Sequence, residues 1–184
     1  MRTAARAVLA NATETAVLVL VPEVEAAVSG HRADLDMAAS WGVPAHLSVV
    51  YPFVPPADVD DDVLAGLATA VRTVPAFPCV FRRTEWFGDD VLWLASEPDG
   101  PFRALSSAVV AAFPAHLPYG GAYDDLVPHL PVGELRLGSA AEMAAAERSV
   151  RGRLPIRAWV DRAVLLAGRP ERDSWQPVAE FGLG

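Results

Sequence analysis

The sequence predicts an α+β fold built from two similar lobes, and three observations support this prediction. Strand-like apolar runs alternate with segments of helical periodicity along the chain. Two of these runs begin with histidine, at His46-Leu47-Ser48-Val49 and His129-Leu130-Pro131-Val132, and each precedes a helix and further strands. The length of 184 residues and the 52% hydrophobic content suit one full core. Paired β-α-β units of this kind fit the ferredoxin-like class of α+β sandwich.

The first part of the chain places the first histidine strand between two helices. Residues 1–14 are a polar lead-in that we expect to be loosely ordered, and 16–21 form a continuous apolar run that suits a strand buried on both faces. Residues 23–41 have apolar side chains near helical spacing, and the histidine strand follows over 46–51. The segment 58–71 is predicted to be a second helix, because acidic residues crowd its first turn, where the helix dipole favours them.

The middle of the chain reads as a hairpin, a helix and a long loop. Residues 77–87 and 91–95 are predicted strands, joined by Gly88-Asp89-Asp90, a sequence typical of a hairpin turn. A third helix is predicted over 101–113. The segment 114–128 is rich in Pro, Gly and Tyr and is expected to be a loop.

The last part of the chain begins with the second histidine strand and ends in two further strands. An Ala-rich helix is predicted over 139–151, with Ser139 as its N-cap. The runs 156–167 and 175–181 are predicted to be strands. Because nothing in the pattern requires a second core, we expect residues 1–184 to form a single domain.

Alternation within the histidine strands separates polar from apolar side chains. In a strand, residues i and i+2 share a face, so His46 and Ser48 point one way while Leu47 and Val49 point the other. Two such strands side by side would bring two imidazoles together. Histidine is the side chain best suited to exchange protons near neutral pH, so the pair indicates acid/base chemistry. A lone histidine on an apolar strand is more often structural, and that alternative stays open for each residue.

The residues around both histidines resemble the 2H phosphoesterase superfamily, in particular its 2′-5′ RNA ligase-like branch, which is recognised by two His-x-Thr/Ser-x motifs. The resemblance extends over roughly residues 15–180. The segments that carry it are Gly42 to Phe53, Leu92-Trp93-Leu94, Pro118-Tyr119-Gly120-Gly121 and Pro128-His129. It implies two ferredoxin-like lobes that flank a central cleft.

The same resemblance implies a metal-independent phosphoesterase without a cofactor. Its substrate would be a small nucleotide or RNA-end phosphodiester, either a 2′,3′-cyclic phosphate or a 2′-5′ linkage. His46 and His129 would be the catalytic acid and base, in an order that the sequence leaves open. Ser48 would hold a non-bridging phosphate oxygen.

One position departs from the family pattern. Pro131 stands where the second motif has a hydroxyl residue, and proline offers neither a hydroxyl nor a backbone N–H. A hydrogen bond to a charged group contributes about 1.5–3 kcal/mol, so its loss would slow turnover by roughly 10- to 150-fold. The alternative function is therefore a weakened or inactive protein that still binds a nucleotide or RNA end. A scaffold without a small-molecule site is a third class.

Other residues are candidates for substrate or metal binding. Arg82 and Trp86 could contact a phosphate and a base, and Tyr123 could line the cleft entrance. The alternatives are a solvated strand face with one packed Trp, and ordinary loop anchoring. The spacing of His31, His116 and the two motif histidines matches no zinc-ligand pattern, so no metal site is expected.

Composition excludes several classes of partner and chemistry. The net charge of −8 disfavours binding to long nucleic acid, and no membrane span is expected. The fifteen basic residues are all Arg, which rules out a ligase working through an adenylated lysine, Schiff-base chemistry and the P-loop. Cys79 is the single cysteine, so an internal disulfide is impossible, and a buried inert thiol is expected. A cytoplasmic protein is expected; the oligomeric state is not predicted.

Overall fold

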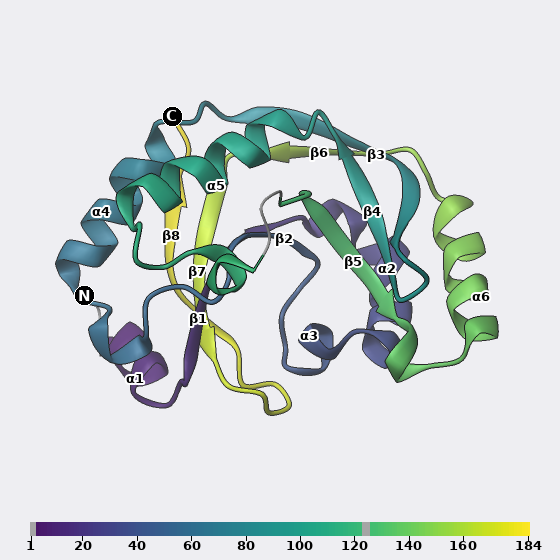
Figure 1. Cartoon of the computed structure of the whole chain (residues 1–184), viewed down its shortest axis with the longest axis horizontal. Coiled ribbons are helices and arrows are strands. Elements are labelled where there is room, and N and C mark those ends of the chain that lie inside the picture. Colours follow the sequence, from purple (N-terminus) through teal and green to yellow (C-terminus); the bar gives the residue numbers. More distant parts are fainter. Residues whose placement is uncertain (1–2, 123–125) are drawn as a thin grey trace.

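The computed structural model describes residues 3–122 and 126–184 (Figure 1). Within them, eight strands form two antiparallel sheets of four. In spatial order, the first sheet consists of β2 (His46–Val50), β1 (Glu14–Leu20), β7 (Arg162–Gly168) and β8 (Gln176–Gly182). The second consists of β5 (His129–Glu134), β4 (Val91–Glu97), β3 (Phe77–Phe87) and β6 (Ile156–Val160). The α+β prediction is confirmed, with one sheet in each lobe.

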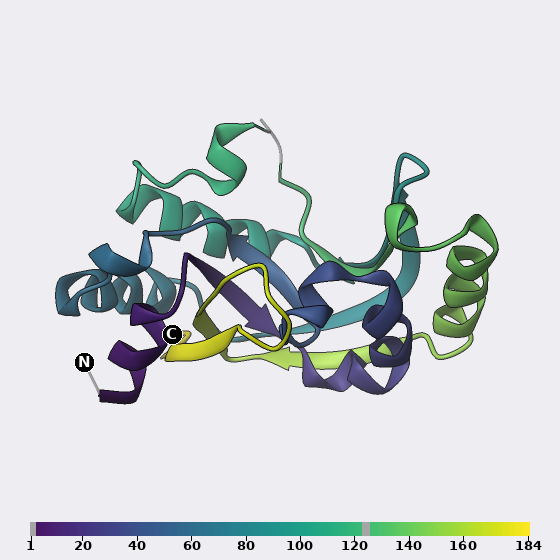
Figure 2. The same ribbon diagram turned by 90° about the horizontal axis from the view of Figure 1, so that it is seen from below.

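Helices cover the sheets in two groups at opposite ends of the molecule (Figures 1 and 2). In the first lobe, α4 (Asp61–Arg72) and α5 (Gly100–Ala112) pack together and against β8 and β2, and α1 (Thr3–Ala10) packs on β8. In the second lobe, α2 (Pro22–Leu35) and α6 (Ala140–Arg151) pack on β5 and its neighbours. The short helices are α3 (Met37–Ser40), η1 (Pro56–Asp58), η2 (Pro118–Gly121) and η3 (Leu135–Leu137). Each lobe therefore takes helices from distant parts of the chain.

The segment 156–167, predicted as one strand, is two strands in different sheets. β6 lies in the second sheet and β7 in the first, with Asp161 between them. Burial alternates along β6 but is nearly continuous along β7. This change marks the point where the chain crosses from one lobe to the other, and an apolar pattern alone does not reveal it.

Two further expectations need correction near the start of the chain. The lead-in over 1–14 is not loosely ordered where the structure describes it, because α1 forms there and buries Ala5 and Leu9. The helix predicted over 23–41 is interrupted at Asp36, whose carboxylate accepts a hydrogen bond from the Ala38 N–H and so caps α3.

Three other local expectations are met, at Ser139, in the β3–β4 hairpin and at Cys79. Ser139 is the N-cap of α6 and forms a capping box with Glu142, so two backbone N–H groups at the helix start gain acceptors. The hairpin strands β3 and β4 pair on both sides of the predicted turn. Cys79 is buried, and burial raises the pKa of its thiol to about 12, which keeps it protonated. None of the described helices is long and apolar enough to cross a membrane.

The core has two parts with different positions relative to the lobes. The larger one lies between the helices and the sheets and includes Leu47, Val49 and Leu130. A smaller cluster lies on the opposite face of the first sheet and includes Leu18, Val164, Leu166 and Trp175. The first sheet is therefore apolar on both faces, which explains the uninterrupted runs in β1 and β7.

Candidate active site

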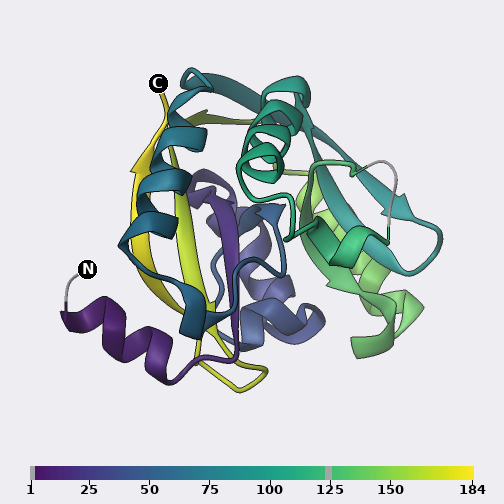
Figure 3. The ribbon, with the colours of Figure 1, turned by 60° about the vertical axis from the view of Figure 1, so that its left-hand side comes forward.

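Both histidine strands are edge strands, and they contact each other between the lobes (Figures 1 and 3). His46 lies opposite Leu20 of β1, and His129 lies opposite Ala95 of β4. Each histidine is the first residue of its strand. The fold thus brings together two motifs that are far apart in the sequence.

Alternation orients the first motif as the sequence predicts. Leu47 and Val49 point into the large core, whereas Ser48 shares a face with His46 and lies opposite Leu18 of the smaller cluster. His46 is 6% exposed and Ser48 is half-buried. His46 is therefore buried, whereas Ser48 on the same face is more accessible to solvent.

The two imidazoles are held in the same way. His46 Nδ1 lies 2.8 Å from the Pro44 carbonyl oxygen, and His129 Nδ1 lies 2.9 Å from that of Val127. In both cases the acceptor is two residues before the histidine. Because a carbonyl oxygen only accepts, each Nδ1 carries the hydrogen, and Nε2 of the neutral ring is left as a proton acceptor.

Burial and nearby charges favour the neutral form of His46. Its pKa is lowered to about 4, first by burial and then by the positive charge of Arg32. The Pro44 hydrogen bond and Asp36 act in the opposite direction, and His129 lowers the pKa further. A positive charge on His129 therefore disfavours protonation of His46.

His129 has a different environment. Burial lowers its pKa, and the hydrogen bond to Val127 opposes that effect. Phe87 packs edge-on to its ring with centroids 4.9 Å apart, and Phe87 in turn stacks on Trp93. Aromatic contacts hold this ring, whereas charged groups lie beside His46.

A pocket beside His129 gathers polar and aromatic side chains from several elements. Its lining includes Ser48 of β2, Ser106 of α5, Tyr51, Tyr119 and His129. Tyr51 donates to Glu14 at 2.8 Å and packs edge-on to Tyr119, which places both rings on one wall. Among the described residues, the lining includes His129 but not His46. Hydroxyls and an imidazole around one pocket suit a phosphate group.

Pro131 lies where the strand tolerates proline. It is on edge strand β5, opposite Trp93, next to a register irregularity in the pairing of β4 with β5. Edge strands and bulges are the places in a sheet where proline is found, because a residue there need not donate a ladder hydrogen bond. Being two residues from His129, it shares the histidine's face. A hydroxyl side chain here would face the same side as His129.

Two of the other predicted binding residues lie elsewhere. Trp86 lines a different pocket, with Leu135 and Met143, on the side of the sheet covered by α6. Trp86 is thus not among the described residues that line the His129 pocket, because alternation turns it away and brings its neighbour Phe87 to His129; a contact of Trp86 with substrate stays a prediction. Arg82 is exposed and forms an ion pair with Glu97 at 3.1 Å, and it is not among the described residues that line the His129 pocket.

The remaining predictions concern Tyr123 and metal binding. Tyr123 lies outside the described residues. His116 packs edge-on to Phe53. Within residues 3–122 and 126–184, no three His, Cys, Asp or Glu side chains gather as they would around a metal ion.

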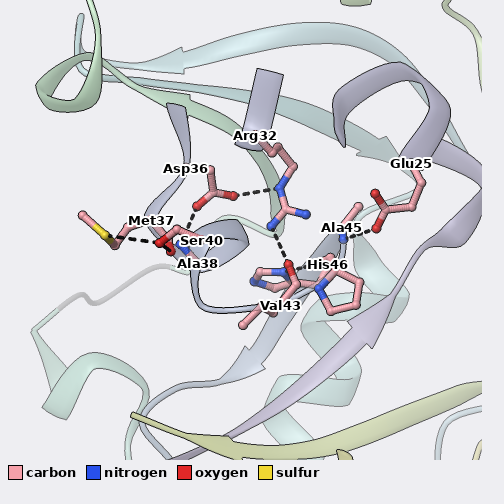
Figure 4. A network of polar contacts seen from close by, with 10 residues as sticks. Glu25, Arg32, Asp36, Met37, Ala38, Ser40, Val43, Ala45 and His46 are labelled. Atoms are coloured by element: carbon pink, nitrogen blue, oxygen red, sulfur yellow. Dashed lines mark hydrogen bonds and ion pairs between the residues drawn. The ribbon is translucent and has the colours of Figure 1, made fainter. Parts of the chain in front are cut away.

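Sequence reasoning missed the charged residues behind His46 (Figure 4). Nothing in the sequence pattern singles out Arg32 or Asp36, yet their side chains are 2% and 3% exposed and form an ion pair at 2.7 Å. Phe87 and Ser106 were missed as well. The burial of Leu35 beside this pair was visible as helical periodicity, but nothing in the pattern revealed that Arg32 itself is buried.

The chain is similar to known proteins in sequence and in structure. The sequence model of the 2′-5′ RNA ligase superfamily matches residues 20–171. Curated protein sequences give no significant match. Among solved structures, Escherichia coli LigT in its apo form is similar with a TM-score of 0.60 at 15% identity, covering 94% of this chain and 98% of LigT. LigT complexed with 3′-AMP has a TM-score of 0.57 at 14% identity, covering 94% and 99%.

A protein from a second organism also has a similar structure. TT0787 of Thermus thermophilus is similar with a TM-score of 0.60 at 16% identity, covering 92% of this chain and 97% of that protein. At these identities the structural likeness establishes the fold, and the match to the family model extends over most of the sequence.

Proposed function

Because the chain belongs to the 2′-5′ RNA ligase superfamily, we propose that it hydrolyses a small nucleotide-like phosphodiester by paired-histidine acid/base catalysis. The substrate would be a 2′,3′-cyclic phosphate or a 2′-5′ linkage. The observation that carries the proposal is the matched pair of carbonyl hydrogen bonds, which gives both rings the same tautomer and leaves both Nε2 atoms available for proton transfer.

In the proposed reaction His46 is the base. Neutral His46 takes a proton from water, the water oxygen bonds to phosphorus, and the bond from phosphorus to one ribose oxygen breaks. His129, in its protonated form, donates a proton to that leaving oxygen, so the two proton transfers balance. A bound phosphate anion favours the protonated form of His129, because an opposite charge raises the pKa of an imidazole.

Binding of the phosphate would depend on side-chain hydroxyl groups more than on positively charged side chains. Ser48 and Ser106 line the pocket beside His129 and would donate to non-bridging phosphate oxygens. The net charge of −8 favours a small ligand over a long polyanion. Escherichia coli LigT has been crystallised with 3′-AMP, NADP+ and ATP, which supports a small nucleotide as the ligand class.

Pro131 supports a second candidate, a protein that keeps the pocket and binds a nucleotide or RNA end without cleaving it. The two candidates differ in turnover but not in binding. The experiment is to incubate purified protein in excess chelator with 2′,3′-cyclic nucleotides and 2′-5′ dinucleotides, and to separate products by chromatography. His46→Asn and His129→Asn proteins serve as controls for contaminating activity.

Hydrolysis by the wild type and not by either variant would support the enzyme. Binding measured by calorimetry without any product would support the second candidate. Absence of both binding and turnover with every member of the panel would overturn both candidate functions.

A further inference from the structure

The ion pair of Arg32 and Asp36 is buried where charges are rarely found. Both side chains are almost fully enclosed, with Arg32 Nε 2.7 Å from a carboxylate oxygen of Asp36. Removing two charges from water is costly, and such pairs seldom stabilise a fold more than apolar residues would. A stability role is therefore a weak explanation for this pair, and its position behind His46 provides a better one.

Arg32 of this pair, together with Glu25, is hydrogen-bonded to the backbone segment that orients His46 (Figure 4). Arg32 Nη2 donates to the Val43 carbonyl at 3.2 Å, and Glu25 accepts a hydrogen bond from the Ala45 N–H at 2.6 Å. The Pro44 carbonyl, which accepts from His46 Nδ1, lies between these two anchored residues. The orientation of the ring thus rests on side chains of α2.

The second motif contains the same contact without the burial. Arg103 of α5 donates to the Leu126 carbonyl at 3.0 Å, and Leu126 precedes His129 by three residues, as Val43 precedes His46. Arg103 also pairs with Asp99 at 2.8 Å, but these two side chains are 36% and 52% exposed. Water screens charges at that exposure. The backbone anchor is common to both motifs, but only the ion pair beside His46 is shielded from water.

We infer that Arg32 and Asp36 are a positioning pair for His46, which fixes the segment that orients the ring and places the positive end of a buried ion pair beside it, so that His46 serves as the base and His129 as the acid. This inference rests on the proposed function for its division of roles. Among the described residues, the charged and titratable groups that act on His46 are Arg32, Asp36 and His129. Arg32 opposes protonation of the ring and Asp36 favours it, so removing each should have opposite effects.

The test measures the pKa of His46 by NMR of its ring nitrogens, in a His129→Asn background so that the partner ring does not titrate. Arg32→Met should raise the pKa of His46 by about one pH unit, because a nearby like charge is lost and Asp36 is left unopposed. Asp36→Asn should lower it. Arg32→Lys keeps the charge and should stay closer to the parent than Arg32→Met.

Two further variants guard against misfolding and non-specific effects. The double variant Arg32→Met/Asp36→Leu removes both charges and leaves no unpaired ion in the core; its His46 pKa should lie between those of the two single variants. Arg103→Met removes the equivalent anchor of the second motif and is the matched control. It should leave the His46 pKa unchanged.

Shifts of the same sign in Arg32→Met and Asp36→Asn, or no shift in either, would overturn the inference. The NMR readout does not need turnover, so it separates this result from failure of the proposed function. If the wild type is active, the acid limb of kcat/KM should also move to higher pH in Arg32→Met with His129 intact. An unmoved acid limb in an active Arg32→Met protein would contradict the assignment of His46 as the base.

Discussion

His46 and His129 occupy equivalent places in two lobes, yet their surroundings differ. Each begins an edge strand, donates from Nδ1 to the carbonyl two residues earlier, and follows an arginine-anchored segment. Around His46 the arginine and its carboxylate partner are buried, whereas around His129 they are exposed and an aromatic pair contacts the ring.

The orientation and the protonation of the two rings are therefore controlled separately. Short backbone hydrogen bonds reproduce the same tautomer in both lobes, because that geometry is local to each strand. In the proposed mechanism, the division into base and acid would depend on charges that lie earlier in the chain than each histidine, and on whether water screens them. A duplicated framework can therefore support two opposite chemical roles.

Replacing either histidine gives the largest expected effect. General acid or base catalysis contributes roughly 10²- to 10⁴-fold, so His46→Asn and His129→Asn should each lower kcat by that factor. Asparagine preserves a donor for the carbonyl that each ring contacts. Initial rates with the best substrate of the panel are the measurement. Wild-type activity in one variant would break the paired account.

Acid should destabilise the protein through His46. The folded-state pKa of about 4 lies below the ordinary 6.5, so between these values the unfolded chain binds more protons than the folded one. The free energy of unfolding should therefore fall as pH decreases from about 6.5 to 4, by about 3 kcal/mol from this residue.

Urea unfolding at several pH values measures this dependence. His46→Asn should flatten the dependence in that window, while the smaller contribution of His129, which has the same sign, should remain. An identical slope in wild type and His46→Asn would show that His46 titrates normally.

Pro131 offers a way to make the two motifs more alike. Pro131→Thr should add a hydroxyl on the face of His129 and raise kcat by roughly 10- to 150-fold, the value of one hydrogen bond to a charged group. Ser48→Ala is the converse variant and should lower kcat by a similar factor. Unchanged kcat in both variants, with ligand binding retained, would favour a binding protein.

The smallest expected effect on kcat distinguishes Phe87 from the adjacent Trp86. Phe87→Ala removes the ring that packs on His129 and should lower kcat by about 2- to 10-fold, the range for one aromatic pair. Trp86→Ala should instead affect stability, because Trp86 packs towards α6. Comparing kcat with the midpoint of thermal unfolding distinguishes the two. A larger loss of kcat in Trp86→Ala would contradict the assigned faces.

The motifs were predictable because their geometry is local. Alternation fixes the faces of His46, Ser48 and Leu47 from sequence alone, and the resemblance to a known family supplied the pairing of the two strands. Trp86 and Phe87 show the limit, since adjacent aromatic residues on one strand take opposite faces. Which of them meets His129 depends on the register of β3 against β4, which no local pattern specifies.

The burial of Arg32 and Asp36 was not predictable for a related reason, and neither was the crossing of segment 156–167 from one lobe to the other. Arg32 and Asp36 have the i,i+4 spacing of a solvated helix pair, and their burial results from where α2 packs. The split of 156–167 between two sheets also depends on distant partners. Long-range packing, more than local propensity, produced the asymmetry between the two motifs.

Two histidines that make the same Nδ1 hydrogen bond differ in how readily each ring takes a proton. Correlation of ring nitrogens with ring protons by NMR, across a pH titration of the wild type, tests this difference directly, because it reports tautomer and pKa together. We expect both neutral rings to carry hydrogen on Nδ1, and His46 to titrate at lower pH than His129. An Nε2–H tautomer in either ring, or His129 titrating at or below the pH of His46, would contradict the account.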